Sequence, residues 1–244
     1  MNSEQINKIY KQYKKNLKLD FLSINKIIIQ ETNSEGIAAE LKDINYQEGF
    51  AILSINAELF SQSSILHNSA ILYHEFTHIW DSVKYLRTFQ NKELKKKLLF
   101  PYTEYHASRI ELLKRLDHFI FSKQITLNSS VYDKNRIVSL RDFLKSENEE
   151  INWRYEKLSS CPNLNNILAL FYRLIYNMGY FSILQENHVE KNFHIDIKPM
   201  NYAKRKMHKL YKILHNPDIT DQSILDANDL CQKIIDLTSK YYLM

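Results

Sequence analysis

Residues 73–81 read Tyr-His-Glu-Phe-Thr-His-Ile-Trp-Asp and contain the pattern His-Glu-x-x-His at positions 74 to 78. Residues four apart lie on the same face of an α-helix, so His74 and His78 would point at one place, with Glu75 about 100° round the axis. Two imidazoles placed in this way can bind one metal ion, and the glutamate can act as a general base on water. The segment therefore predicts a site for metal-assisted hydrolysis.

The residues around this pattern predict a long helix. Apolar and small residues recur at three- and four-residue intervals from Ser63 to Val83, with no glycine or proline between them. The pattern thus lies in the middle of one helix. Two histidines that are merely satisfied by hydrogen bonds are the alternative, but their spacing on one face favours ligation.

A catalytic zinc ion normally has three protein ligands and one position for water, so a third ligand is needed. The metzincin pattern is excluded, because Asp81 and Lys84 occupy the places of its glycine and its third ligand. The remaining candidates are glutamates further along the chain, namely Glu93, Glu104 and Glu111.

A second helical pattern, Tyr102–Phe121, follows Pro101, whereas the lysine-rich residues after Glu93 are typical of a surface turn or short helix. On that helix Glu104 and Glu111 share one stripe with the small residues Ala107 and Ser108, which would allow a close approach to the first helix. We expect Glu104 to be the third ligand and keep Glu111 as the alternative. An exposed carboxylate paired to Arg109, Lys114 or Arg115 is the other explanation for either residue.

With these two motifs, His74-Glu75-x-x-His78 and Glu104-x-x-Ala107-Ser108, the chain resembles the gluzincins, zinc peptidases whose third ligand is a glutamate on a later helix. It is most similar to the small cytosolic peptidases of the ImmA/IrrE type, over roughly residues 24–122. Many gluzincins have Asp, and ImmA/IrrE-type chains often have Asn, where this chain has Ser108. The resemblance implies a zincin-like α+β fold and one Zn²⁺ per chain. It also implies hydrolysis of a peptide bond in a narrow protein substrate.

In the expected mechanism, zinc held by His74, His78 and Glu104 polarises water, and Glu75 takes its proton and passes it to the leaving amine. Other side chains would support the ligands or stabilise the transition state, and several remain open. The candidates are Ser108, Tyr102, Tyr105, Asp81 and Glu111, with His106, His188, His194 and His208 as further electrophiles.

Three short strands are predicted before the first motif helix, at Asn25–Gln30, Gly36–Leu41 and Gly49–Asn56. In zincins the strand just before that helix is a sheet edge that pairs with an extended substrate through the main chain. We therefore expect residues 50–56 to form this edge. Its substrate-binding residues would be Ile52, Ser54 and Asn56, and an ordinary core strand is the alternative.

The rest of the chain is predicted to be helical. With 244 residues, 44% of them hydrophobic, and only three glycines and four prolines, the chain favours long helices and a sizeable core. We expect an α+β catalytic region in residues 1–125, comprising an N-terminal helix, the small sheet and both motif helices. An all-helical region in residues 136–244 would cap or flank the cleft. Its predicted helices are Ile137–Leu158, Asn163–Gln185, Tyr202–His215 and Gln222–Tyr242.

Composition favours a cytoplasmic protein with no membrane or nucleic-acid partner. Residues 6–19 form an amphipathic, lysine-rich pattern rather than a signal peptide, and Cys161 and Cys231 have no metal-binding spacing. The apolar stretch 167–184 is interrupted by polar residues and is expected to be a buried helix. The net charge is +5, and the densest basic run, Lys204–Lys209, is typical of one solvated helix face. The oligomeric state is left open.

Three functions fit these features. The first is an active zinc peptidase, the second a zincin-fold sensor or binding module with slow or no turnover, and the third a metal-dependent hydrolase of a substrate other than a peptide. Glu75 favours an enzyme, because a purely structural zinc has no use for a general base.

Overall fold

The computed structural model describes the whole chain except residues 21, 34–36, 87–91, 120–123, 190–202 and 244. The described residues form eight helices and five short strands, so the chain is an α+β protein in which helix predominates. They group into two compact units. The first comprises residues 1–89, 110–124 and 128–139, and the second residues 90–109, 125–127 and 140–244. The sequence-based division assigned catalysis to residues 1–125 and a capping or flanking role to residues 136–244. These roles stay a prediction.

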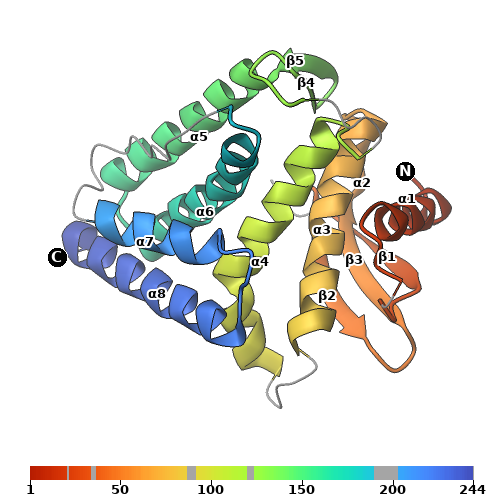
Figure 1. Cartoon of the computed structure of the whole chain (residues 1–244), viewed down its shortest axis with the longest axis horizontal. Coiled ribbons are helices and arrows are strands. Elements are labelled where there is room, and N and C mark those ends of the chain that lie inside the picture. Colours follow the sequence, from red (N-terminus) through yellow and green to blue (C-terminus); the bar gives the residue numbers. More distant parts are fainter. Residues whose placement is uncertain (21, 34–36, 87–91, 120–123, 190–202, 244) are drawn as a thin grey trace. The chain divides into compact units, whose positions relative to one another are not determined.

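The first unit contains a three-stranded sheet with the order β1-β3-β2 (Figure 1). Strand β3 (Phe50–Asn56) pairs in parallel with β1 (Lys26–Thr32) and antiparallel with β2 (Ala39–Asn45). Ala51, Leu53 and Ile55 of β3 are buried, as is typical of a strand in the middle of a sheet. The three predicted strands are thus present, although β2 lies further along the chain than predicted.

The expectation that residues 50–56 form a sheet edge is wrong. Strand β3 pairs with a neighbour on both sides, so its main chain cannot accept a further strand. Ile52 pairs with Ile28 and Asp43, and Ser54 is buried. Asn56 is also buried, and its side chain accepts a hydrogen bond from the Leu59 N–H at 3.1 Å, at the start of α2 (Ala57–Ser61). These three residues therefore cannot bind a substrate in the expected way.

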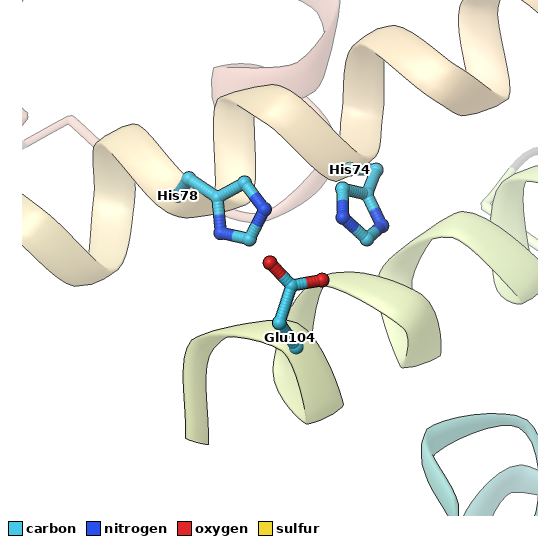
Figure 2. Close-up of side chains that lie close together, drawn as sticks. All are labelled: His74, His78 and Glu104. Atoms are coloured by element: carbon cyan, nitrogen blue, oxygen red, sulfur yellow. The ribbon is translucent and has the colours of Figure 1, made fainter. Parts of the chain in front are cut away.

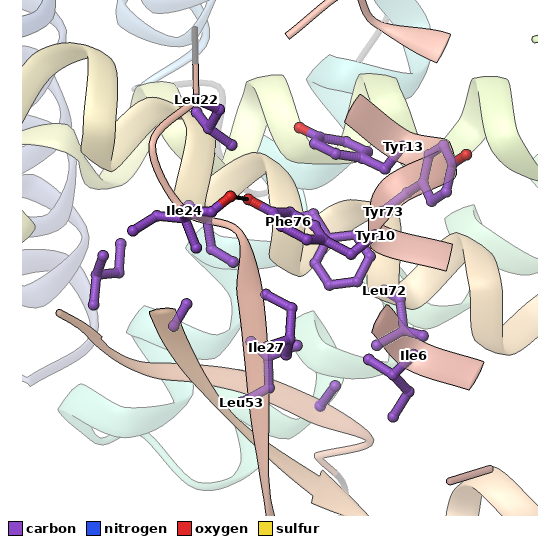
Figure 3. Close-up of a cluster of buried hydrophobic side chains, with 14 of the residues drawn as sticks. Ile6, Tyr10, Tyr13, Leu22, Ile24, Ile27, Leu53, Leu72, Tyr73 and Phe76 are labelled. Carbon is purple, nitrogen blue, oxygen red and sulfur yellow. Dashed lines mark hydrogen bonds between the residues drawn. The ribbon is translucent and has the colours of Figure 1, made fainter. Parts of the chain in front are cut away.

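Helices α1 (Ser3–Asn16) and α3 (Ile65–Leu86) build the core of this unit together with the sheet (Figure 3). Tyr10 and Tyr13 of α1 lie edge-on to Phe76 of α3, with ring centroids 4.8 and 5.5 Å apart. The buried hydroxyls are satisfied, because Tyr10 donates to the Ile24 carbonyl at 3.1 Å and Tyr13 bonds to Thr77 Oγ1 at 3.1 Å. One face of α3 is thereby fixed in the core, which determines the direction of the opposite face.

A hairpin of two short strands, β4 (Ser130–Asp133) and β5 (Arg136–Ser139), completes the first unit. Its turn consists of Lys134 and Asn135, and Lys134 has a φ of 52°, in the left-handed region. The prediction of a helix from residue 137 is wrong for this segment. The helix begins at Leu140, where the hairpin ends.

Helix α4 (Lys92–Arg115) carries the second motif and differs from its prediction at both ends. It begins before Pro101, which lies inside the helix, and it ends before residue 121. A proline within a helix removes one main-chain hydrogen bond, so the sequence favoured a helix start there. The residues of α4 up to Arg109 group with the second unit and those from Ile110 with the first. The unit boundary therefore falls within one continuous helix.

The second unit is helical and includes four further helices: α5 (Leu140–Ser160), α6 (Leu164–Glu186), α7 (Lys204–Leu214) and α8 (Asp221–Leu243). Within it α5 packs on α6, and α8 packs on both α6 and α7. The predicted helices 163–185, 202–215 and 222–242 are confirmed to within about two residues over their described segments. Lys204, Arg205, His208 and Lys209 of α7 are exposed, whereas Met207, Leu210, Tyr211 and Leu214 are buried.

Helix α6 is, among the described residues, the one helix long and apolar enough to cross a membrane. More than half of its most apolar window is buried inside the protein, and core helices of globular proteins meet the same criteria. The prediction of a buried bundle helix agrees with this burial. The absence of a membrane partner remains a prediction.

Gly179 allows α6 to pass very close to α4. A Cβ atom at this position would overlap the Ser108 hydroxyl and the main-chain carbonyl of Tyr105. Because the carbonyl belongs to the α4 backbone, it cannot move aside without shifting the helix. Ser108, whose small size was expected to serve an approach to the first motif helix, therefore serves the packing of α4 on α6.

We expect Gly179→Ala to destabilise the protein by about 1–3 kcal/mol, the usual cost of overpacking a filled interior. At a helix position with open space, the same change would stabilise the protein by up to about 1 kcal/mol. The sign of the change in the free energy of unfolding therefore distinguishes close packing from open space. Urea unfolding of the variant measures the effect. Asn165→Ala, at an exposed position of the same helix, is the control. An increase in stability for Gly179→Ala would contradict the close packing.

Candidate metal centre

Helix α3 places His74 and His78 one turn apart on the face opposite the aromatic core. Figure 2 shows both imidazoles and the Glu104 carboxylate directed at one place. One ligand atom from each of the three side chains lies within 4.8 Å of the others, and His74 is buried while the other two are half-buried. Among the described residues this is the one group of three or more metal-ligating side chains. It contains the three ligands expected from the sequence.

The direction of Glu104 follows from the continuity of α4. Glu104 and Glu111 are seven residues apart, which is nearly two turns, so both project from the same face about 10 Å apart along the axis. Glu111 Oε2 lies 3.2 Å from His74 Nδ1. This contact fixes the side of α4 that faces α3, and Glu104 shares that side.

Glu111 is buried and held between a histidine and an arginine. Its Oε1 accepts a hydrogen bond from Arg115 Nε at 2.8 Å and forms an ion pair with Arg115 Nη2 at 2.7 Å, while Oε2 faces His74. Burial raises the pKa of the Glu111 carboxyl, but Arg115 and His74 outweigh it and bring the pKa to about 2. Glu111 is therefore a carboxylate that faces His74.

The contact with Glu111 also determines which nitrogen of His74 is available to a metal. A carboxylate oxygen 3.2 Å from Nδ1 favours the proton on that nitrogen, so Nε2 is the nitrogen suited to bind a metal. Tetrahedral zinc with bonds of about 2.0–2.1 Å places its ligand atoms roughly 3.3 Å apart. Side chains whose ligand atoms lie within 4.8 Å can reach one ion through small rotations. The two histidines and the glutamate thus fit zinc.

Glu75 is buried and in contact with the sheet. Its Oε2 accepts a hydrogen bond from the Leu41 N–H of β2 at 2.8 Å. Leu41 lies where the pairing of β2 with β3 shifts register, and such a bulge can turn an N–H out of the ladder. A main-chain donor next to the metal ligands therefore holds one carboxylate oxygen. The sequence did not indicate this contact.

Two other residues expected near the centre, Ser108 and Tyr105, have partners elsewhere. Ser108 Oγ donates to the Tyr105 carbonyl at 2.9 Å, within α4. The Tyr105 hydroxyl bonds to His215 Nδ1 at 2.9 Å in the second unit, and burial raises its pKa. Asp81 is buried on α3, and its charge helps to raise the pKa of Tyr13, although burial of Tyr13 is the main cause.

The remaining candidate electrophiles are spread over the chain. Tyr102 is buried and stacks on His106, with ring centroids 5.7 Å apart. His188 follows the end of α6 and His208 lies on α7, and both are exposed. His194 lies outside the described residues. The choice among these groups stays open.

Arg115 and His67 belong to the surroundings of the centre. The sequence suggested Arg115 only as a partner of an exposed carboxylate, whereas Glu111 is buried, and it did not indicate His67. Arg115 Nη1 donates to His67 Nδ1 at 2.8 Å and to the Tyr132 carbonyl at 2.9 Å. The Lys134 N–H also donates to His67 Nδ1, at 2.8 Å. Because arginine and a main-chain N–H can only donate, Nδ1 must be the acceptor and His67 must be neutral. Burial and Arg115 accordingly lower the pKa of His67 to about 4.

This lowered pKa predicts a pH dependence of stability. In the unfolded chain His67 takes up a proton below about pH 6.5, whereas in the folded protein it does so only near pH 4. The unfolded state therefore binds more protons between these values, and stability falls as the pH is lowered from 6.5 to 4. We expect a loss of about 1–2 kcal/mol, after allowance for partial exposure of the ring.

The control for this pH dependence is His67→Asn, which keeps an acceptor near the position of Nδ1 but does not titrate. The groups that face His67 are Arg115, Glu111, Asp133 and Lys134, and all are retained in the variant. Urea unfolding at several pH values should give a shallower slope between pH 6.5 and 4 for the variant. Equal slopes would contradict the neutral, buried His67.

Comparison of the chain with protein-family models, with curated proteins and with solved structures found no match in any of the three.

Proposed function

We propose that this chain is a zinc-dependent metallopeptidase of the gluzincin type, with a zincin-like arrangement of the small sheet and the two motif helices. The observation that carries the proposal is the convergence of His74, His78 and Glu104, with Glu75 next to the first ligand on the same helix. The Glu111 carboxylate 3.2 Å from His74 Nδ1 adds to it, because metal-binding histidines almost always have an acceptor beside their other ring nitrogen.

When bound by His74, His78 and Glu104, zinc would supply a Lewis acid that makes water nucleophilic near neutral pH. Glu75 would accept the proton of the attacking water and deliver it to the leaving amine. The Leu41 N–H donates to Oε2 of Glu75 at 2.8 Å and so orients the carboxylate. Glu111 would keep the His74 ring in one orientation throughout.

A peptide substrate that extends the sheet would use an outer strand, because β3 is paired on both sides. Of the two outer strands, β2 is the one in contact with Glu75, through Leu41. We therefore assign the binding of an extended peptide to β2 rather than to β3. Main-chain pairing would supply affinity there, and pockets for alternate side chains would supply selectivity.

The experiment that tests this function measures amide hydrolysis directly. The purified protein is loaded with Zn²⁺ and incubated with a proteome-derived peptide mixture, and new amino termini are identified by mass spectrometry. We expect termini that arise with Zn²⁺ and disappear with a chelator. A protein that binds zinc but yields no such termini would support the sensor or binding module instead. Zinc-dependent products without new termini would indicate a substrate other than a peptide.

A further inference from the structure

A chain of buried charged groups connects the ligand His74 to the β4–β5 hairpin. It runs from His74 to Glu111 at 3.2 Å, and from Glu111 to Arg115 at 2.7 Å. Arg115 then reaches the main chain of β4 at Tyr132, at 2.9 Å. Glu111 and Arg115 are 1% and 6% exposed, so water screens these contacts very little.

Arg115 uses the full fork of its guanidinium in this chain. Nε donates to Glu111 Oε1 and Nη2 forms an ion pair with the same oxygen, while Nη1 donates to His67 Nδ1 and to the Tyr132 carbonyl. A planar guanidinium with fixed N–H directions can contact Glu111 and the hairpin at the same time, whereas a lysine ammonium cannot. Because both Arg115 nitrogens that contact Glu111 lie at Oε1, the carboxylate is oriented with Oε2 towards His74.

The hairpin is in turn attached to the start of α3. The Lys134 N–H donates to His67 Nδ1 at 2.8 Å, and the Ser64 N–H donates to the Lys134 carbonyl at 3.1 Å. Ser64 also caps α3, because its Oγ accepts the His67 N–H at 3.2 Å. The turn of the hairpin is thus held by the same helix that carries the two histidine ligands.

We propose that Arg115 is a positioning residue that fixes the metal ligand His74 through Glu111, and that docking of the β4–β5 hairpin sets the orientation of Arg115. This inference rests on the proposed metal centre. Without Arg115 the Glu111 carboxylate would turn away from His74, and the ring would lose the partner that fixes its orientation. Metal affinity is therefore coupled to hairpin docking.

The first test measures Zn²⁺ affinity by competition with a chromophoric chelator. Arg115→Met is expected to lower the affinity by about 10- to 100-fold, and Arg115→Lys by at least about 10-fold, because lysine cannot contact Glu111 and the hairpin together. Arg136→Met is the matched control, since Arg136 lies in the same hairpin and its side chain is 67% exposed. It should bind Zn²⁺ like the wild type.

A second measurement distinguishes positioning from general stabilisation. At saturating Co²⁺ the visible absorption of the ion reports its ligand geometry, and it should change in Arg115→Lys while the far-ultraviolet circular dichroism stays the same. A residue that only stabilised the fold would alter the unfolding transition but leave the Co²⁺ spectrum and the Zn²⁺ affinity of the folded protein unchanged.

Arg115→Met leaves Glu111 buried without its cation and could unfold the protein. A double variant is therefore added, which also completes a double-mutant cycle of Glu111 and Arg115. Glu111→Gln combined with Arg115→Met removes both charges, a replacement that folded proteins often tolerate. If Arg115 acts through Glu111, the double variant should bind Zn²⁺ about as weakly as Glu111→Gln alone. Losses that simply multiply would overturn the proposed route.

Hydrogen exchange tests the coupling from the other side. The coupling between Zn²⁺ binding and hairpin docking acts in both directions. If undocking of the hairpin weakens Zn²⁺ binding by a certain factor, saturating Zn²⁺ should slow hydrogen exchange of the Lys134 amide by the same factor. Wild-type protein that binds neither Zn²⁺ nor Co²⁺ would overturn the metal centre and this inference with it. Wild-type binding together with Arg115 variants within about twofold of its affinity would overturn the inference alone.

Discussion

Replacing His78 by Ala is expected to lower Zn²⁺ affinity by more than about 100-fold, because two remaining ligands cannot hold the ion in a tetrahedral site. The same loss is expected for His74→Ala and Glu104→Ala, since one ligand atom of each lies within 4.8 Å of the others. Metal analysis of the purified proteins should give close to one zinc per chain for the wild type and much less for these variants.

Two further variants make this comparison specific. Glu111→Gln removes the support of His74 but no ligand, so its loss should stay within about 10- to 100-fold. His208→Ala removes an exposed histidine of α7 and should have no effect. A greater loss for Glu111→Gln than for Glu104→Ala would reverse their roles. Wild-type binding by all three ligand variants would rule out the centre.

The first motif helix could be predicted because its information is local. The apolar spacing from Ser63 to Val83 specifies a helix, and a separation of four residues places two histidines on one face whatever they contact. The stripe that contains Glu104 follows from the same periodicity. What periodicity cannot give is the register between two helices, so it could not show that Glu111 lies against His74.

The position of β3 was missed although a signal was present. The run Phe50-Ala51-Ile52-Leu53-Ser54-Ile55 is apolar almost throughout, which is typical of a strand buried on both faces rather than of an edge. The expectation of an edge came from the family resemblance. The parallel pairing of β1 with β3 joins residues 26–32 to residues 50–56. The sequence of neither segment alone predicts which strand it pairs with.

The hairpin and its contacts with Arg115 were missed for a different reason. Its turn, Lys134-Asn135, lacks the glycine that usually indicates a tight two-residue turn, and its strands have only four residues each. Arg115 looks in the sequence like one of several basic residues at the end of a helix. Its role depends on three partners that lie 4, 17 and 48 residues away along the chain.

Glu75→Gln should separate metal binding from catalysis. The amide keeps the length of the side chain, and its oxygen can still accept the Leu41 N–H that holds Glu75 at 2.8 Å. Zinc content and unfolding stability should therefore change little. The amide cannot take up a proton from the attacking water, and loss of a positioned general base typically lowers the rate by about 10²- to 10⁴-fold.

The matched comparison is Glu75→Ala, which removes both the base and the acceptor for Leu41. It should lose activity to the same extent as Glu75→Gln but should also be less stable, because the Leu41 N–H is left without this partner. Activity is measured as new amino termini in lysate of the native host, with the wild type and both variants loaded with Zn²⁺. If Glu75→Gln produced the same zinc-dependent termini as the wild type, Glu75 could not be the base. The proton would then have to be accepted by another group, although the metal ligands would stand.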